Sequence, residues 1–274
     1  MQSDMNPAGT APADTGIEVT RSGDDIIQIR LNRPERLNAL GMDMVVALAQ
    51  AIADAIAAEA RVLLVRGTGR AFCAGADLKE RRTMDEAARL KHNRAINSAV
   101  DALAAAPMPT IAVINGLALG GGCEIALACD FRIAANDTQI GLTEARIGAI
   151  PGAGGTQRLP RLIGAARALE LMLLGEPVGT QRAAEIGLVN AAVATDKLDA
   201  HAQRIAAVLA SRSPRGAQTM KRLVYHSIEV PLAEGLAQER AALQQVFTSA
   251  DYAEGLAAFA DKRPPQFGRG NLPS

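Results

Sequence analysis

The sequence predicts an α/β fold followed by a helical C-terminal subdomain. In roughly the first two thirds of the 274 residues, short apolar runs typical of strands alternate with longer segments of helical periodicity. From Lys197 onward only helical segments follow. Hydrophobic residues make up 49% of the chain and aromatic residues only 3%, so we expect a core of Ala, Leu, Ile and Val. The length favours one main domain with a smaller appended element.

Individual helices and strands are predicted from the periodicity of apolar residues and from the residues that end a helix. Proline cannot continue a helix, and Pro107 and Pro109 therefore end the helix predicted before them. The expected strands are Ile17–Arg21, Ile26–Leu31, Val62–Arg66, Ile111–Ile114, Phe131–Ala134 and Gln139–Leu142. The expected helices are Met42–Glu59, Asp85–Ala105, Cys123–Cys129, Leu198–Ala210, Pro214–Ser227, Leu232–Phe247 and Tyr252–Ala260.

These elements divide the chain into three parts. Residues 1–16 are rich in small and polar residues and contain proline, and we expect them to form a disordered lead. They lack the charged-then-apolar order of a signal peptide. Residues 17–195 form the core domain, and residues 196–274 the helical subdomain and a polar tail. The apolar stretch around Leu117 to Cys129 is too short to span a bilayer and contains Glu124. We therefore expect a cytoplasmic protein that does not enter a membrane.

Charge and cysteine content disfavour several classes of function. The formal net charge is zero, from 29 basic and 29 acidic residues, whereas nucleic-acid binders usually carry a basic excess that neutralises phosphates. Cys73, Cys123 and Cys129 are odd in number and lack the spacing of metal ligands. We expect reduced, buried thiols, with neither a disulfide framework nor a metal site.

A glycine run lies between a predicted strand and a predicted helix. Gly120, Gly121 and Gly122 allow backbone angles closed to other residues and bring bare backbone close to a ligand. The free N–H groups at a helix start favour negative charge. Neither the G-x-G-x-x-G pattern of a dinucleotide site nor the G-K-[ST] of a phosphate loop is present. The remaining interpretation is an anion hole for a small developing charge, such as an oxyanion.

Two glutamates are the candidate acid and base. Glu124 lies in the first turn of an apolar helix, where a carboxylate also stabilises a helix without any catalytic role. Glu144 precedes a second glycine-rich loop, where a solvated acid is the ordinary alternative. If they converge, the like charges raise one pKa, and the two can act as acid and base on one water molecule. Their spacing alone does not show that they converge.

Several long motifs together resemble the enoyl-CoA hydratase/isomerase (crotonase) superfamily. They are LNRPERLNAL at 31–40, AFCAGADL at 71–78, NGLALGGGCE at 115–124, IPGAGGTQRLPRLIG at 150–164 and KRPPQF at 262–267. The resemblance covers residues 17–268 and implies a spiral of ββα units with a helical trimerisation region. The stretch GADLKER with LALACD is similar to the methylglutaconyl-CoA hydratase branch, which includes relatives that bind AU-rich RNA.

The resemblance implies a role for each site residue. The N–H groups of Ala76 and Gly121 match the oxyanion-hole donors that bind the thioester carbonyl oxygen. Glu124 would deprotonate the water attacking C3, and Glu144 would protonate C2. The CoA-binding segments, implied in the same way, comprise Arg36, Leu37, Ala74, Gly75, Ala76, Asp77 and Leu78, with Gly120 and Gly121 beside the thioester.

Other side chains are expected to serve the fold. Asp77 could be catalytic, but we interpret it as ordering the loop that presents Ala76. Without a serine elbow, the three histidines (His92, His201 and His226) are interpreted as surface or packing residues. A basic cluster follows Asp77 and is either a solvated face or a contact for CoA phosphates or an acidic acyl group: Lys79, Arg81 and Arg82.

The sequence therefore predicts an enoyl-CoA hydratase of β-oxidation or branched-chain catabolism. The predicted partner is an acyl-CoA thioester, no metal or redox cofactor is expected, and the resemblance implies a homotrimer or homohexamer. A Δ3,Δ2-enoyl-CoA isomerase is the nearest alternative, since it needs only one carboxylate. A methylglutaconyl-CoA hydratase and, more distantly, an RNA-binding protein remain open.

Overall fold

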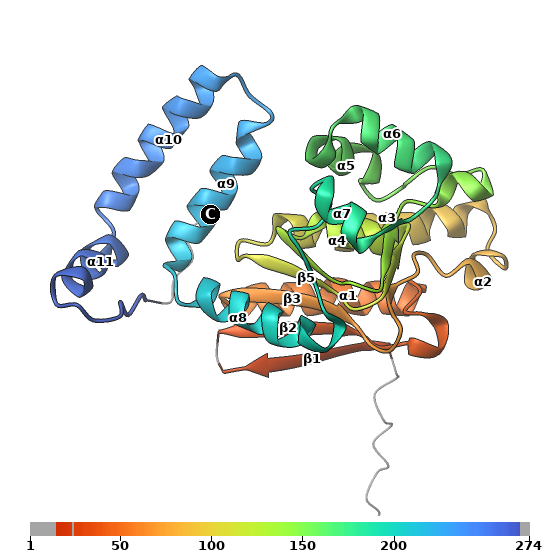
Figure 1. The fold of residues 1–274 in the computed structure, drawn as a ribbon, viewed down its shortest axis with the longest axis horizontal. Helices are drawn as coiled ribbons and strands as arrows, with labels where there is room; N and C mark the ends of the chain where they lie inside the picture. The colour runs from red at the N-terminus through yellow and green to blue at the C-terminus, as the bar shows by residue number, and fades with distance from the viewer. Residues whose placement is uncertain (1–14, 24, 269–274) are drawn as a thin grey trace, which may run out of the picture.

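The computed structural model describes residues 15–23 and 25–268. Two sheets form its centre (Figure 1). The larger sheet has the order β1-β2-β3-β5-β7-β10, with only β1 and β2 antiparallel. Its strands are β1 (Ile17–Ser22), β2 (Ile26–Leu31), β3 (Val62–Gly67), β5 (Thr110–Ile114), β7 (Phe131–Ala135) and β10 (Ala191–Val193).

The smaller sheet has the order β4-β6-β8-β9. Its strands are β4 (Ala71–Cys73), β6 (Leu117–Leu119), β8 (Gln139–Gly141) and β9 (Val178–Gly179). Each of β3, β5 and β7 in the large sheet is followed directly by a strand of the small sheet and then by helix, so the chain advances in repeated ββα turns. This confirms the predicted α/β spiral.

Helices cover both faces of the large sheet. On one face lie α1 (Met42–Ala57), α3 (Glu86–Ala105) and α4 (Gly121–Ala128), whose apolar residues join the main core. The central strands β3 and β5 read as continuous apolar runs because a parallel sheet covered on both faces buries both sets of side chains. The remaining helices of the core are α2 (Leu78–Arg81), α5 (Gly155–Ile163), α6 (Ala165–Leu174) and α7 (Thr180–Glu185), with 3-10 turns η1 (Pro34–Arg36), η2 (Glu144–Ile147) and η3 (Thr195–Lys197).

The first helix of the predicted C-terminal subdomain lies on the sheet. Helix α8 (Leu198–Ala210) packs Leu198, Ala202 and Ala206 against apolar side chains of β3, β5 and β7. The predicted boundary at residue 195 therefore falls before a helix that covers the second face of the core. The helical arm begins after Ala210, and in Figure 1 its helices α10 and α11 lie to the left of the two sheets.

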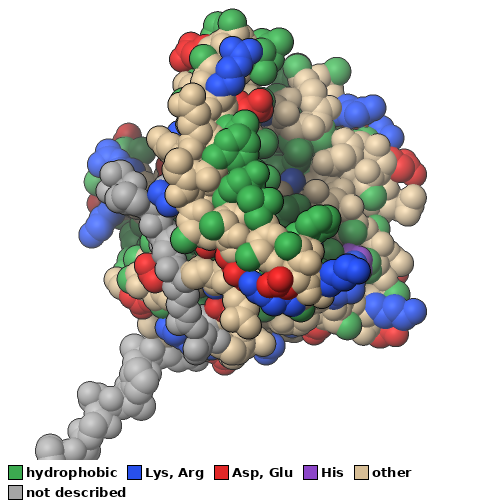
Figure 2. Space-filling model, turned by 90° about the vertical axis from the view of Figure 1, so that its left-hand side faces the viewer, with side chains coloured by type: hydrophobic (Ala, Val, Ile, Leu, Met, Phe, Trp, Pro, Cys, Tyr) green, Lys and Arg blue, Asp and Glu red, His purple; other side chains and the backbone are tan. Residues whose placement is uncertain are grey.

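The arm consists of α9 (Pro214–Ser227), α10 (Leu232–Phe247) and α11 (Ala250–Ala260). The predicted start of α11 at Tyr252 was two residues late, because Ser249 caps the helix by accepting from the Tyr252 N–H. Apolar side chains gather over this arm in Figure 2. They include the exposed residues Met220, Val224, Ile228, Leu232, Phe247, Leu256 and Phe259.

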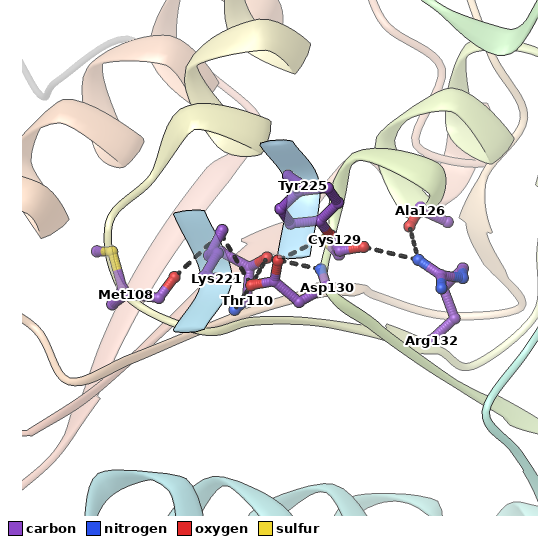
Figure 3. Close-up of polar contacts among 8 residues, drawn as sticks. All are labelled: Met108, Thr110, Ala126, Cys129, Asp130, Arg132, Lys221 and Tyr225. Atoms are coloured by element: carbon purple, nitrogen blue, oxygen red, sulfur yellow. Dashed lines mark hydrogen bonds and ion pairs between the residues drawn. The ribbon is translucent and has the colours of Figure 1, made fainter. Parts of the chain in front are cut away.

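A largely buried ion pair fixes α9 to the core (Figure 3). Lys221 Nζ lies 2.8 Å from Asp130 Oδ2, and each side chain is only 12% exposed. Asp130 also accepts from the Tyr225 hydroxyl at 2.9 Å and from the Thr110 N–H at 2.8 Å. Because one carboxylate joins β5, the start of β7 and α9, the base of the arm is held even though its outer helices are exposed.

The close approach of α4 to β4 depends on glycine. Helix α4 begins at Gly121, two residues before the predicted start, since the glycines that indicate a turn are themselves its first turn. A Cβ at Gly122 would lie 2.1 Å from the Cys73 carbonyl oxygen, so no larger residue fits without moving the backbone.

Gly122→Ala should therefore destabilise the protein by about 1–3 kcal/mol or more, as overpacking does. Thermal or denaturant unfolding measures this effect. Gly179→Ala is the matched control, since Gly179 has an ordinary φ of −65° and nothing within 4 Å of its Cβ position. Equal stability of the two variants would show that the packing of α4 against β4 does not require a glycine at position 122.

Candidate active site

Two glycine-containing backbone segments meet where β4 ends and α4 begins. Gly75 has φ +91°, and a Cβ there would lie 2.9 Å from the Leu119 carbonyl oxygen and 3.2 Å from the Gly121 nitrogen. Gly120 also has a positive φ, +52°. Only glycine accepts both the conformation and the crowding. The glycine run thus brings two loops into direct contact.

Two N–H groups lie together at this contact. Leu40 donates to the Gly75 carbonyl at 2.8 Å and accepts from the Asp77 N–H at 3.0 Å. The intervening Ala76 N–H takes no part in that pairing, and the Gly121 N–H is at the first position of α4. Within the described part of the chain neither N–H donates to another group, and the Cβ position of Gly121 is 3.7 Å from the Ala76 nitrogen. The pair can bind one anionic oxygen.

Asp77 orders the loop that carries Ala76. Its carboxylate accepts from the N–H groups of Lys79 and Glu80, both at 3.1 Å, and so caps α2. It also lies 2.6 Å from Arg36 Nη1. Burial alone would raise its pKa, but the Glu80 N–H and Arg36 hold that pKa below its usual value. With these contacts made, Asp77 acts as a structural anion, in agreement with the interpretation of the sequence.

Glu124 points from the first turn of α4 into the core and is 3% exposed. Its Oε1 accepts from the N–H of Ala153 at 2.6 Å and from that of Gly155 at 2.9 Å. Burial raises the pKa of Glu124, although these two N–H groups and Arg158 oppose the rise. One oxygen is thus anchored by the second glycine-rich loop, and the other remains for a ligand.

Glu144 begins η2 and is half-buried. Its Oε1 is 3.0 Å from where a Cβ of Gly120 would lie, which places the carboxyl beside the glycine run. Its Oε2 is buried and has no hydrogen-bond partner in the described structure. Burial is the main cause of a raised pKa, and the negative charge of Glu124 raises it further. The charge of Glu124 therefore reaches the Glu144 carboxyl.

The two segments that were expected to bind CoA lie side by side. The Ala74 N–H donates to the Leu37 carbonyl at 3.0 Å, and Arg36 pairs with Asp77. Leu37 and Asn38 have positive φ values of 54° and 55°. The fully buried Asn38 side chain compensates by donating to the carbonyls of Thr68, Ala71 and Phe72. Leu78, the last residue of the segment 74–78 that was expected to bind CoA, is 48% exposed.

Arg81 is a site residue that the sequence did not single out from its neighbours. Lys79 and Arg82 are exposed, but Arg81 is half-buried and its charge lowers the pKa of both Glu124 and Glu144. It makes no ion pair within 4.0 Å in the described structure. In the sequence, the only feature that distinguishes Arg81 is its position four residues after Asp77. That feature is a weak indication of a site residue.

A cleft of about 830 Å³ lies elsewhere, between α9 and the core helices α3, α4 and α5. Its lining includes Arg132, Arg158, Lys221 and Tyr225 but neither glutamate of the site. His201 and His226 lie on α8 and α9, away from the glycine contact. The three cysteines are buried and unbridged, and burial raises the thiol pKa of Cys73 and Cys129 to about 12. No helix within the described residues is long and apolar enough to cross a membrane.

Comparison with known proteins identifies the family. The model of the enoyl-CoA hydratase/isomerase family matches residues 21–270. The chain belongs to this family. It is 43% identical over 248 residues to human mitochondrial enoyl-CoA hydratase domain-containing protein 2, covering 88% of this chain and 85% of that protein. It is 39% identical over 249 residues to mouse mitochondrial methylglutaconyl-CoA hydratase, covering 88% and 79%.

Solved structures support the same family assignment. The crystal structure of an enoyl-CoA hydratase from Bacillus anthracis superposes with a TM-score of 0.90 at 41% identity, covering 93% of this chain and all of that one. In this member of the enoyl-CoA hydratase/isomerase family, two N–H groups that donate to nothing in the described structure lie near the half-buried Glu144 carboxyl. They also lie at the start of the helix that carries the buried Glu124. Such an arrangement can stabilise an oxyanion and move protons to and from the same bound molecule.

The raised pKa of Glu124 makes a prediction about stability. When folding raises the pKa of a carboxyl, its contribution to the free energy of unfolding is fully present at pH values below the unfolded-state pKa. That contribution is lost as the pH rises through the folded-state pKa. Each pH unit by which a pKa is raised corresponds to about 1.4 kcal/mol. Glu124→Gln keeps an acceptor oxygen for Ala153 and Gly155 but never ionises.

We therefore expect Glu124→Gln to be more stable than the wild type at pH 8, with the gain shrinking toward pH 4.5. Denaturant unfolding across this pH range measures the difference. The exposed Glu170→Gln serves as control and should show no such trend. A Glu124→Gln variant that is less stable at pH 8 would mean that the ionised carboxylate is favourably held.

Proposed function

We propose that this protein is an enoyl-CoA hydratase, which adds water across the 2,3-trans double bond of an enoyl-CoA thioester. The proposal rests on two carboxyls, the buried Glu124 and the half-buried Glu144, of which the first acts electrostatically on the second. They accompany the N–H groups of Ala76 and Gly121, which donate to no group in the described structure. An isomerase needs only one carboxylate to move a proton between carbons, so the second buried glutamate favours hydration.

The reaction follows from what each group offers. The thioester carbonyl oxygen accepts from the Ala76 and Gly121 N–H groups, and the positive end of α4 favours the charge that develops there. The free oxygen of Glu124 takes a proton from water as the water oxygen bonds to C3. The π electrons move toward the carbonyl and form an enolate, which collapses as Glu144 gives its proton to C2. Atoms and charge balance, and the proton on Glu124 returns to Glu144 by exchange with solvent.

The electrostatics of the pair support this division of roles. Hydration in this direction needs one ionised and one protonated glutamate, and two interacting buried carboxyls share one proton over a wide pH range. The two N–H groups on Glu124 favour its ionised form, whereas Glu144 has a buried Oε2 without a partner. Glu124 is therefore the base and Glu144 the acid. We propose that no metal or redox cofactor takes part, since these groups supply every proton transfer.

A carboxylated enoyl-CoA is a second candidate substrate. The half-buried guanidinium of Arg81 acts electrostatically on both glutamates and makes no ion pair within 4.0 Å in the described structure. Such a cation could offset the repulsion between the glutamates and a substrate carboxylate. The relative named methylglutaconyl-CoA hydratase is consistent with this candidate. Comparing kcat/KM for crotonyl-CoA and 3-methylglutaconyl-CoA decides between them.

The apolar arm supports a proposal about assembly. The exposed apolar residues along α9, α10 and α11 leave a hydrophobic surface that a lone protomer would expose to water (Figure 2). We propose that this surface joins copies of the chain into a homotrimer or a dimer of trimers. The unbridged cysteines fit a reducing compartment, and we propose the cytoplasm.

Loss of the conjugated-thioester absorbance on mixing with crotonyl-CoA tests the function. We expect rapid loss with the wild type, and a decrease in kcat of about 100- to 10,000-fold in Glu124→Gln and in Glu144→Gln, because each loses a proton-transfer group. Glu170→Gln, at an exposed position on α6, is the control for a lost carboxylate and should match the wild type.

Near-normal turnover in either active-site variant would contradict the two-carboxylate mechanism. No absorbance loss with a folded wild type, combined with conversion of a 3-enoyl-CoA, would assign the protein as an isomerase instead.

A further inference from the structure

His92 is a buried polar residue to which the proposed chemistry gives no role. It lies on α3 with no exposed surface, and its Nδ1 is 3.1 Å from Arg81 Nε. An arginine Nε–H can only donate, so Nδ1 must be the acceptor and the ring proton must lie on Nε2. The structure therefore defines both the neutral state of His92 and its tautomer.

The surroundings of the ring favour this neutral state. Burial and the positive charge of Arg81 lower the pKa of His92, and they outweigh Glu80, Asp77 and the Leu40 carbonyl, which raise it. Nε2 is buried without a hydrogen-bond partner in the described structure. A protonated ring would lose the acceptor for Arg81 and place a second positive charge against it.

Arg81 needs such a holder because its own helix is short. Helix α2 has four residues, Leu78–Arg81, and Arg81 is its last. The long guanidinium side chain loses considerable rotamer freedom when it is held in one place. The bond to His92 comes from α3, a twenty-residue helix that packs against α1 and α4. A rigid helix thus determines where the charge of Arg81 lies.

The location of that charge matters to the glutamates. Arg81 lowers the pKa of both Glu124 and Glu144, while each glutamate in turn favours the charged form of Arg81. For Glu124 the other cation that acts in this way is Arg158, which is itself paired with Asp101 at 2.8 Å. Arg81 makes no such pair in the described structure, so no neighbouring carboxylate neutralises the charge that acts on the two glutamates.

We infer that His92 is a positioning residue: through its Nδ1 it holds the guanidinium of Arg81 toward Glu124 and Glu144, so that this cation compensates the negative charge of the pair. The inference rests on the proposed function, in which one glutamate is ionised while an enolate forms nearby. If Arg81 moves away, both carboxyls lose a favourable charge and protonate at higher pH. The acidic limb of the pH–rate profile then moves to higher pH.

Kinetics of His92→Leu and His92→Asn test this role. His92→Leu fills the space but lacks the acceptor; His92→Asn places an amide oxygen near the former Nδ1. We expect His92→Leu to lower kcat roughly tenfold or more, as a misplaced charged group does, with KM changed less than about twofold. The acidic limb of kcat/KM should move upward, and His92→Asn should recover a large part of both effects. His201→Leu, a half-buried histidine on α8, is the control.

A double-variant cycle shows whether His92 acts through Arg81. If it does, adding His92→Leu to Arg81→Met changes kcat little further, because the group that His92 holds is already gone. Additive losses, or a His92→Leu variant with reduced kcat but an unshifted pH profile, would overturn the inference and leave His92 as a packing residue only.

A titration that needs no turnover separates this inference from the proposed function. Infrared difference spectra follow the protonated-carboxyl band with pH, and subtraction of the Glu124→Gln and Glu144→Gln spectra assigns the two glutamates. His92→Leu should raise the pH at which they protonate, whether or not any enoyl-CoA is hydrated. An unchanged titration overturns the inference even if hydration is confirmed, whereas a shifted titration in a protein inactive on every enoyl-CoA sustains it and rejects the function.

Discussion

The backbone contact between the end of β4 and the start of α4 is the constraint on which the site depends. Gly122 fits against the Cys73 carbonyl and Gly75 against the Leu119 carbonyl only because neither has a side chain. This contact places the Ala76 and Gly121 N–H groups at one point. It also fixes the first turn of α4, and with it the direction in which Glu124 enters the core. One packing contact thus sets the positions of the groups that we propose as the oxyanion donors and the base.

The carboxyls show how the fold tolerates a costly feature. A buried carboxylate is expensive unless it is hydrogen-bonded. Ala153 in the loop before α5 and Gly155 at the start of α5 each donate an N–H to Glu124, and Arg81, bonded to His92, supplies a charge to both glutamates. The remaining cost persists as raised pKa values of Glu124 and Glu144. The penalty to the fold and the capacity for acid catalysis have the same physical origin.

Much of this arrangement could be predicted from the sequence. The alternation of apolar runs and helical segments predicted the α/β organisation, and the motif resemblance implied the spiral of ββα units. The glycine run with Glu124 and Glu144 predicted which residues form the candidate site. These features are local, or are read from long motifs in a fixed order. The two glutamates are twenty residues apart, and only the motif resemblance suggested that they meet.

The remainder depends on tertiary packing that no local pattern encodes. The small-residue periodicity of α8 is the same whether the helix covers the sheet or a partner. The sequence therefore does not distinguish α8 from the helices of the arm. Arg81 could not be distinguished from Lys79 and Arg82 until the rotation of the short α2 was known. The pairing of His92 with Arg81 depends on how the chain turns between α2 and α3. The role of Asn38 depends on the carbonyls of Thr68, Ala71 and Phe72, which lie 30, 33 and 34 residues further along the chain.

The polarisation of a bound thioester tests the oxyanion site most directly. In a Glu124→Gln/Glu144→Gln background, bound crotonyl-CoA persists, and its conjugated absorbance should shift to longer wavelength because two N–H donors draw charge onto the carbonyl oxygen. Adding Gly121→Pro removes one donor at a helix position that accepts proline. The account predicts that the shift is largely lost while CoA-ester binding remains. An equal shift in both proteins would show that the Gly121 N–H does not bind the carbonyl oxygen, and would contradict the account.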